Sequence, residues 1–72
     1  MNSLNVAKIQ LNGDPYEIKT RTNLNELLNK LKIEKNKVAI EVNGEIIQKD
    51  KYKSLVLNKD DKIEIVHFIG GG

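Results

Sequence analysis

The sequence has no cysteine and no tryptophan, and it has one histidine and one proline among its 72 residues. Without cysteine, neither a disulfide framework nor a thiolate zinc site can add to the stability of the fold. The lone histidine, His67, has no thiol to activate, and we expect it to be an ordinary strand residue rather than a catalytic base. Asp60 and Asp61 are adjacent, but in a turn between strands such residues usually cap backbone N–H groups. The sequence therefore nominates no catalytic residue and no metal ligand, and we expect the chain not to be an enzyme.

An excess of charge of one sign and long apolar segments are also missing. Twelve Lys and Arg residues are balanced by ten Asp and Glu residues, so the net charge is +2. Binding of nucleic acid by phosphate neutralisation needs a far more concentrated positive field. The lysines between residues 49 and 62 are interspersed with acidic residues, which is typical of a solvated surface. No segment has the length of a membrane span, and residues 1–4 do not begin a basic and then apolar leader. We therefore expect a cytoplasmic protein with no nucleic acid and no membrane among its partners.

The composition that remains is typical of a small folded domain. Hydrophobic residues make up 39% of the chain and charged residues 31%, which is too apolar for a disordered polyelectrolyte. The length suits one domain and no more. We expect one domain over residues 1–69, followed by a flexible glycine tail at residues 70–72.

The first part of the chain predicts a β-hairpin. Apolar and polar residues alternate over residues 7–11, which is the period of a strand with one buried face. Asn12-Gly13 follows and suits a type I′ turn, which places Tyr16 opposite Ile9. Pro15 cannot donate a ladder hydrogen bond, so the second strand is expected at an edge of the sheet.

After this hairpin the period changes to that of an α-helix. Apolar residues recur at i, i+3, i+4 and i+7, namely at Leu24, Leu27, Leu28 and Leu31. Asn23 and Glu26 have the spacing of a capping box, which predicts the start of the helix. Lys30 and Lys32 suit its negative C-terminal end, and the expected length is about three turns.

The rest of the chain predicts further strands. Residues 38–42 alternate, and Asn43-Gly44 predicts a tight turn into a short strand at residues 45–48. Three apolar residues are expected to anchor the connecting segment that follows: Tyr52, Leu55 and Leu57. Residues 62–69 predict the last strand, with Ile63 and Ile65 on one face and Glu64, Val66 and Phe68 on the other. This order of elements predicts an α+β domain of the ubiquitin-like β-grasp kind, with a mixed sheet of four to five strands and one main helix packed on one face.

The chain closes on Gly70, Gly71 and Gly72. Glycine averages about 7% of residues, so two glycines in succession arise by chance at a terminus only about once in two hundred chains. A frayed end is the simple interpretation of such a tail. The glycines, however, directly follow an apolar strand, and from Ile69 to Gly72 an extended chain reaches about 14 Å. A chain end without side chains fits into a narrow active site, and its terminal carboxylate is not sterically hindered. A carboxylate is a poor acyl donor, so an ATP-using partner would have to activate it before a sulfur or nitrogen nucleophile attacks.

The residues resemble those of the ThiS family of thiamine-biosynthesis sulfur carriers, within the ubiquitin-like β-grasp proteins. The resemblance covers essentially the whole chain. It is carried by the short hairpin and by three segments, which are residues 24–28, 38–45 and 61–66 leading to Gly71-Gly72. The chain departs from the family pattern at residues 59–61, where a glycine is usual, and at Tyr52, near a common tryptophan. Gly70 stands where the family tolerates small residues, so Gly71-Gly72 is expected to be the functional pair.

The resemblance implies a sulfur carrier that is a co-substrate of partner enzymes and binds no cofactor itself. A ThiF-like adenylyltransferase would use ATP and Mg²⁺ to form an acyl-adenylate on Gly72. Sulfur from a cysteine-derived persulfide would displace AMP and leave a C-terminal thiocarboxylate. A ThiG-like thiazole synthase would then take this sulfur into the thiazole ring of thiamine.

The surface that binds these partners is expected on the face of the last strand that the helix leaves open. This expectation nominates Val66, Phe68 and Ile69, although Val66 and Phe68 are equally well explained as ordinary core residues. Other functions remain open from the sequence. The chain is also compatible with the small subunit of molybdopterin synthase, with a carrier for tRNA thiolation, and with a β-grasp interaction module that carries no sulfur.

Overall fold

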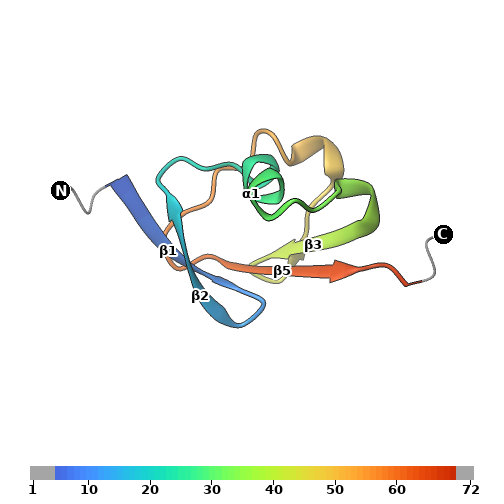
Figure 1. Ribbon diagram of the computed structural model, residues 1–72, viewed down its shortest axis with the longest axis horizontal. Helices are drawn as coiled ribbons and strands as arrows, with labels where there is room; N and C mark the ends of the chain where they lie inside the picture. The colour runs from blue at the N-terminus through green and yellow to red at the C-terminus, as the bar shows by residue number, and fades with distance from the viewer. Residues whose placement is uncertain (1–4, 70–72) are drawn as a thin grey trace.

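The computed structural model describes residues 5–69. Five strands form one mixed sheet in the order β2-β1-β5-β3-β4. The elements are β1 (Val6–Leu11), β2 (Asp14–Lys19), α1 (Leu24–Leu31), η2 (Lys35–Lys37), β3 (Val38–Val42), β4 (Glu45–Ile46), η3 (Lys49–Lys51) and β5 (Lys62–His67). The helix α1 and the 3-10 turn η3 lie on the same side of the sheet (Figure 1). The expected β-grasp architecture is confirmed, with five strands.

The predicted N-terminal hairpin is confirmed in register as well as in place. Ile9 lies opposite Tyr16 in the antiparallel pair of β1 and β2. Asn12 and Gly13 both have positive φ angles, 50° and 87°, as a type I′ turn requires. The strand β2 lies at the edge of the sheet, where Pro15 leaves no ladder hydrogen bond unmade.

The helix α1 begins as the capping box predicts and ends earlier than expected. The Glu26 N–H donates to Asn23 Oδ1 at 2.7 Å, and the Asn23 N–H donates to Glu26 Oε1 at 2.9 Å. The helix has 8 residues, about two turns rather than the expected three. It ends because Lys32 adopts the left-handed conformation, with φ 60°.

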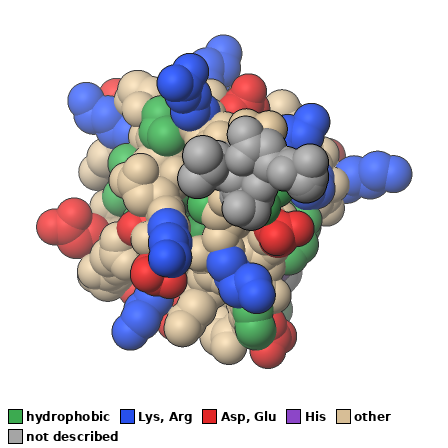
Figure 2. Space-filling model, turned by 90° about the vertical axis from the view of Figure 1, so that its left-hand side faces the viewer, with side chains coloured by type: hydrophobic (Ala, Val, Ile, Leu, Met, Phe, Trp, Pro, Cys, Tyr) green, Lys and Arg blue, Asp and Glu red, His purple; other side chains and the backbone are tan. Residues whose placement is uncertain are grey.

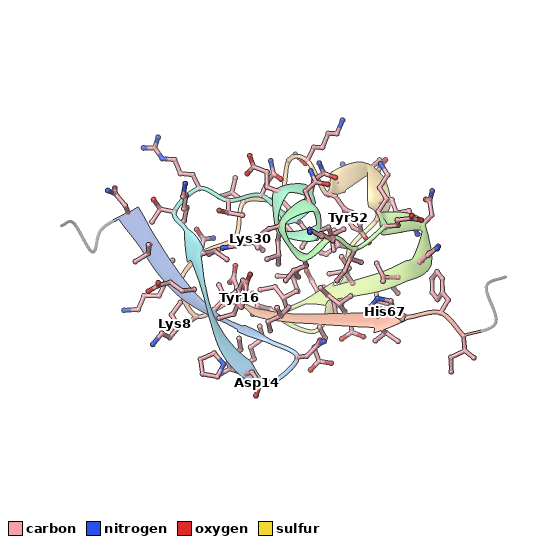
Figure 3. All side chains as sticks on the ribbon, in the orientation of Figure 1. Lys8, Asp14, Tyr16, Lys30, Tyr52 and His67 are labelled. Atoms are coloured by element: carbon pink, nitrogen blue, oxygen red, sulfur yellow. The ribbon has the colours of Figure 1, made fainter. Side chains whose placement is uncertain are left out.

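The core lies between α1 and the sheet. Its buried members come from every part of the domain: Ile9, Ile18, Leu24, Leu27, Leu28, Val38, Ile40, Val42, Tyr52, Leu57, Ile63 and Ile65. Tyr52 and Leu57 confirm that the connecting segment after β4 is anchored in the core, with Leu55 packed against it. Burial raises the pKa of the Tyr52 hydroxyl above its ordinary value, because desolvation disfavours the phenolate. Figure 3 shows Tyr52 beside α1, on the helix side of the sheet.

The asparagines of the two Asn-Gly turns fasten β5, the strand that leads to the chain end. The Ile65 N–H donates to Asn12 Oδ1 at 2.8 Å, across 53 positions of sequence. The Lys62 N–H donates to Asn43 Oδ1 at 2.9 Å, and Asn43 Nδ2 donates to Asp61 Oδ1 at 3.0 Å. Asp61 also accepts the Asn58 N–H, as its place in a turn predicts. Each asparagine therefore closes its own turn and satisfies a backbone group of β5.

Replacing Asn12 with glycine tests how much the hydrogen bond between the Asn12 side chain and the Ile65 N–H contributes to stability. Glycine keeps the left-handed backbone but leaves the Ile65 N–H without its acceptor, so we expect the free energy of unfolding to fall by about 1–3 kcal/mol. Lys32→Gly is the matched control, because the same substitution at another left-handed residue removes no side-chain hydrogen bond, and we expect an unchanged or slightly raised stability. Urea unfolding measures both. Equal effects at the two positions would contradict a role for the Asn12 side chain.

Candidate functional site at the end of the last strand

The strand β5 carries the chain out of the sheet. Its pairing with β3 continues one step beyond the strand, where the Phe68 N–H donates to Lys37 O at 2.9 Å. The strand itself ends at His67, two residues earlier than the sequence predicts, and the Ile69 side chain is 98% exposed. Figure 1 shows β5 running away from the hairpin towards the C-terminal end. Gly70, Gly71 and Gly72 lie outside the described residues, so the expectations placed on them stay predictions.

The predicted alternation along β5 is confirmed within the strand. Ile63 and Ile65 are buried under α1, whereas Val66 is 56% exposed on the opposite face. Val66 is thus not a core residue, which removes one of the two interpretations that the sequence left open. Its cross-strand neighbour on this face is Ala39.

Phe68 lies differently from the expectation that groups it with Val66. It is 53% exposed, but it follows the end of β5, and its ring centroid lies 5.8 Å from Lys49 Nζ. Lys49 belongs to η3, which lies on the helix side of the sheet (Figure 1). The strict alternation of a strand does not extend to a residue beyond its end, so Phe68 lies beside the base of the tail with a cation above its ring.

On the face that carries Val66, one exposed apolar residue, Ile46, was not nominated from the sequence. It is 72% exposed and lies opposite Glu41, which in turn lies opposite Glu64. Cross-strand partners share a face, so these residues form one surface that we call the open face: Ala39, Glu41, Ile46, Glu64 and Val66. The signal that could have found Ile46 is the pair Ile46-Ile47, because adjacent strand residues point to opposite faces and only one of them can enter the core.

No other part of the described chain gathers chemically active groups. Among residues 5–69, no three His, Cys, Asp or Glu side chains come together in a way that could hold a metal ion. His67 lies near the end of β5, far from Lys8 and Asp14 (Figure 3). No helix of residues 5–69 is long and apolar enough to cross a membrane.

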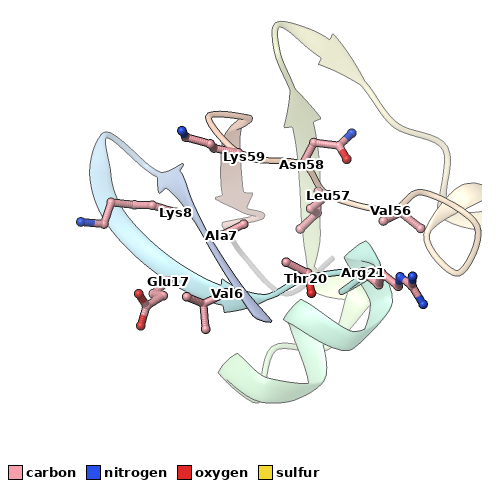
Figure 4. Close-up of a pocket in the computed structure, with 10 residues that line it drawn as sticks. All are labelled: Val6, Ala7, Lys8, Glu17, Thr20, Arg21, Val56, Leu57, Asn58 and Lys59. Atoms are coloured by element: carbon pink, nitrogen blue, oxygen red, sulfur yellow. The ribbon is translucent and has the colours of Figure 1, made fainter. Parts of the chain in front are cut away.

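A shallow hollow lies at the opposite end of the molecule, where β1 begins and β2 ends. It is lined by Val6, Ala7, Lys8, Glu17, Thr20, Arg21 and residues 56–59. The charged ends of Lys8, Arg21 and Lys59 point apart in Figure 4 and do not converge on one ligand position. Figure 2 faces this end and shows basic and acidic side chains interspersed. The features that suit a reactive chain end therefore lie at the other end, around Val66 and Phe68.

Comparison with known proteins agrees with this fold and this chain end. The model of the ThiS family matches residues 9–72, which includes the last glycine. The chain is 43% identical over 65 residues to the sulfur carrier protein ThiS of Bacillus subtilis, covering 89% of this chain and 98% of that protein. The crystal structure of the thiamine biosynthesis protein ThiS from Geobacter metallireducens superposes with a TM-score of 0.79 at 29% identity, covering 90% of this chain and 99% of that chain.

The chain is also similar to a part of two longer proteins. It is 46% identical over 65 residues to a thiazole synthase of Magnetococcus marinus and 40% identical to one of Paramagnetospirillum magneticum. In both cases it spans 20% of the length of the relative. The family model matches most of the chain, the likeness to the Bacillus carrier covers 98% of that protein, and the β-grasp structure is shared, so this chain belongs to the ThiS family.

Proposed function

We propose that this chain is a sulfur carrier of thiamine biosynthesis, and that its sulfur is held as a thiocarboxylate on Gly72. One observation carries the proposal. The family match extends to residue 72, and the final Gly71-Gly72 pair comes four positions after the end of β5, whose last residues lie beside the exposed apolar side chains of Val66 and Phe68.

The chemistry begins with activation of an inert group. An adenylating partner binds ATP with Mg²⁺ and directs a carboxylate oxygen of Gly72 to the α-phosphorus, which forms an acyl-adenylate and releases pyrophosphate. The AMP leaving group makes the carbonyl carbon open to attack. This chain contributes the carboxylate and its placement, and the partner contributes the nucleotide chemistry.

Sulfur then replaces AMP. A cysteine-derived persulfide attacks the carbonyl carbon and forms an acyl disulfide, and a second thiol cleaves the S–S bond to leave the thiocarboxylate. The chain contains no cysteine, so neither the persulfide nor the second thiol comes from its own side chains. The absence of cysteine also leaves the activated Gly72 no thiol of its own chain with which to form a thioester.

Thiazole synthase is the proposed acceptor of the sulfur. A segment similar to this chain makes up about one fifth of each of two proteins named thiazole synthases. This supports a functional association between the sulfur carrier and thiazole synthase. The open face, with Val66 and Ile46 exposed, is the proposed contact surface for the adenylating partner.

Intact-mass measurement tests the carrier function. The purified chain is incubated with ATP, Mg²⁺, a persulfide-generating cysteine desulfurase, a thiol and a ThiF-like adenylyltransferase. We expect the chain to gain the mass difference between sulfur and oxygen, and to lose it again when thiazole synthase and its other substrates are added. A chain that stays at its original mass would reject the carrier function, and sulfur accepted only by a molybdopterin or tRNA pathway would reject the assignment to thiamine.

A further inference from the structure

The strand β5 is paired along its whole length on one side only. On the β3 side, the hydrogen bonds belong to even-numbered residues, as shown by the Phe68 N–H donating to Lys37 O and by Lys62 O accepting the Asn43 N–H at 2.7 Å. The antiparallel register runs from Val42 opposite Ile63 to Val38 opposite His67. The backbone groups of the odd-numbered residues therefore point to the other side, towards β1.

On that side the pairing stops early. The strand β1 pairs in parallel with β5 only at Lys62 and Ile63. Asn12 then ends the ladder, because its N–H donates to Ile63 O at 2.9 Å, its Oδ1 accepts the Ile65 N–H, and its left-handed backbone turns the chain away.

Three backbone groups of β5 after the Ile65 N–H have no hydrogen-bond partner among residues 5–69. They are the C=O of Ile65 and the N–H and C=O of His67. Figure 1 shows the same arrangement, with β5 running past the hairpin while β3 stays alongside it. A strand edge with unmade hydrogen bonds is a template for another extended chain.

The usual protections of such an edge are missing here. Residues 65–68 contain no proline and no lysine, and no bulge interrupts their register with β3. The side chains beside the edge are apolar and accessible, with Val66 56% and Phe68 53% exposed. This combination of free backbone groups and accessible side chains is the one used in recognition by strand addition.

We propose that an extended segment of the protein that adenylates Gly72 adds to the sheet along residues 65–68, in line with β1. This inference rests on the proposed function. The occupant follows from continuity: His67 is five residues before Gly72, and five residues of extended chain span at most about 18 Å. A protein that encloses Gly72 in its active site therefore has residues close to the open edge of β5. Pairing there fixes the direction in which the tail enters the site.

Two variants at one position separate the backbone from the side chain. His67→Pro removes the free N–H, which the β3 ladder does not use, whereas His67→Ala keeps it and removes the imidazole. We expect His67→Pro to raise the Kd for the ThiF-like adenylyltransferase about tenfold, because the lost donor leaves a partner carbonyl unpaired. We expect His67→Ala to change the Kd less than twofold. An equal loss in both variants would assign the contact to the imidazole and overturn the proposal.

Amide hydrogen exchange of the unaltered chain gives a second answer that does not depend on the stability of the proline variant. We expect the His67 amide to exchange fast in the free chain and to be protected in the complex, whereas the Val66 and Phe68 amides are protected in both. A complex that forms the thiocarboxylate while the His67 amide still exchanges fast would overturn the strand pairing and leave the carrier function intact. Protection that rises with the concentration of the free chain would assign the edge to a second copy of this chain instead.

Discussion

Deletion of Gly72 abolishes thiocarboxylate formation and leaves the melting temperature unchanged. The deletion leaves Gly71 at the chain end, so the carboxylate is drawn back by one residue, about 3.3–3.6 Å, from the position in which the adenylating partner binds it. Misplacement of a reacting atom by even about 1 Å can cost a hundredfold in rate. We expect the fold not to change, because the buried core of residues 5–69 runs from Ile9 to Ile65 and so ends seven positions before Gly72.

The matched control is Gly70→Ala. It adds one methyl group two residues before the reactive end, where the family pattern tolerates a small residue, and we expect it to retain most of the activity. Intact-mass measurement after incubation with the adenylyltransferase, ATP and the sulfur source shows whether each variant forms the thiocarboxylate. Thermal unfolding checks the fold of both variants. A Gly72-deleted chain that gains sulfur normally would defeat the assignment of the reactive group.

Substitution of Val66 with aspartate weakens binding to the adenylating partner about thirtyfold or more and lowers stability little. Val66 is more than half exposed, so an aspartate there stays hydrated in the free chain. In the complex the same carboxylate is buried without a partner. A buried charge without a partner in an interface weakens binding by about 2 kcal/mol or more. Glu41 and Glu64 already lie on this open face, which makes the added negative charge less favourable still.

Val6→Asp is the control for this substitution. Val6 is also an exposed valine in a strand, 38% exposed, but it lies beside the hollow at the opposite end of the molecule (Figure 4). We expect its Kd to match that of the unaltered chain. Calorimetry measures the two affinities, and thermal unfolding measures the two stabilities. A large loss of stability with unchanged affinity for Val66→Asp would place the side chain in the structural core and remove it from the docking surface.

Most of the fold was predictable because its signals are local. The Asn-Gly turns, the alternation of β1 and β3, and the leucine stripe of α1 with its Asn23–Glu26 capping box all depend on neighbours within a few positions. The errors are local in the same sense. The helix is shorter than three turns because Lys32 takes a left-handed conformation, and β5 stops at His67 rather than continuing to residue 69.

The reactive chain end stays a prediction, and it rests on a different kind of signal in the sequence. A carboxylate that is to be threaded into another protein needs residues without side chains before it, and glycines at a chain end satisfy this need in any fold. The nomination of Val66 rested on alternation, and the structure confirms that this side chain is exposed. Ile46 was missed because its exposure depends on its pairing with Glu41.

The sequence by itself determined the elements and their order, because both follow from residues close together in the chain. The tertiary structure decided how β5 is held and which of its edges stays open. Asn12 meets Ile65 across 53 positions of sequence, and this contact both fastens the strand and ends its pairing with β1. Such contacts depend on the register between distant segments, and that register is fixed only when the sheet closes over the core.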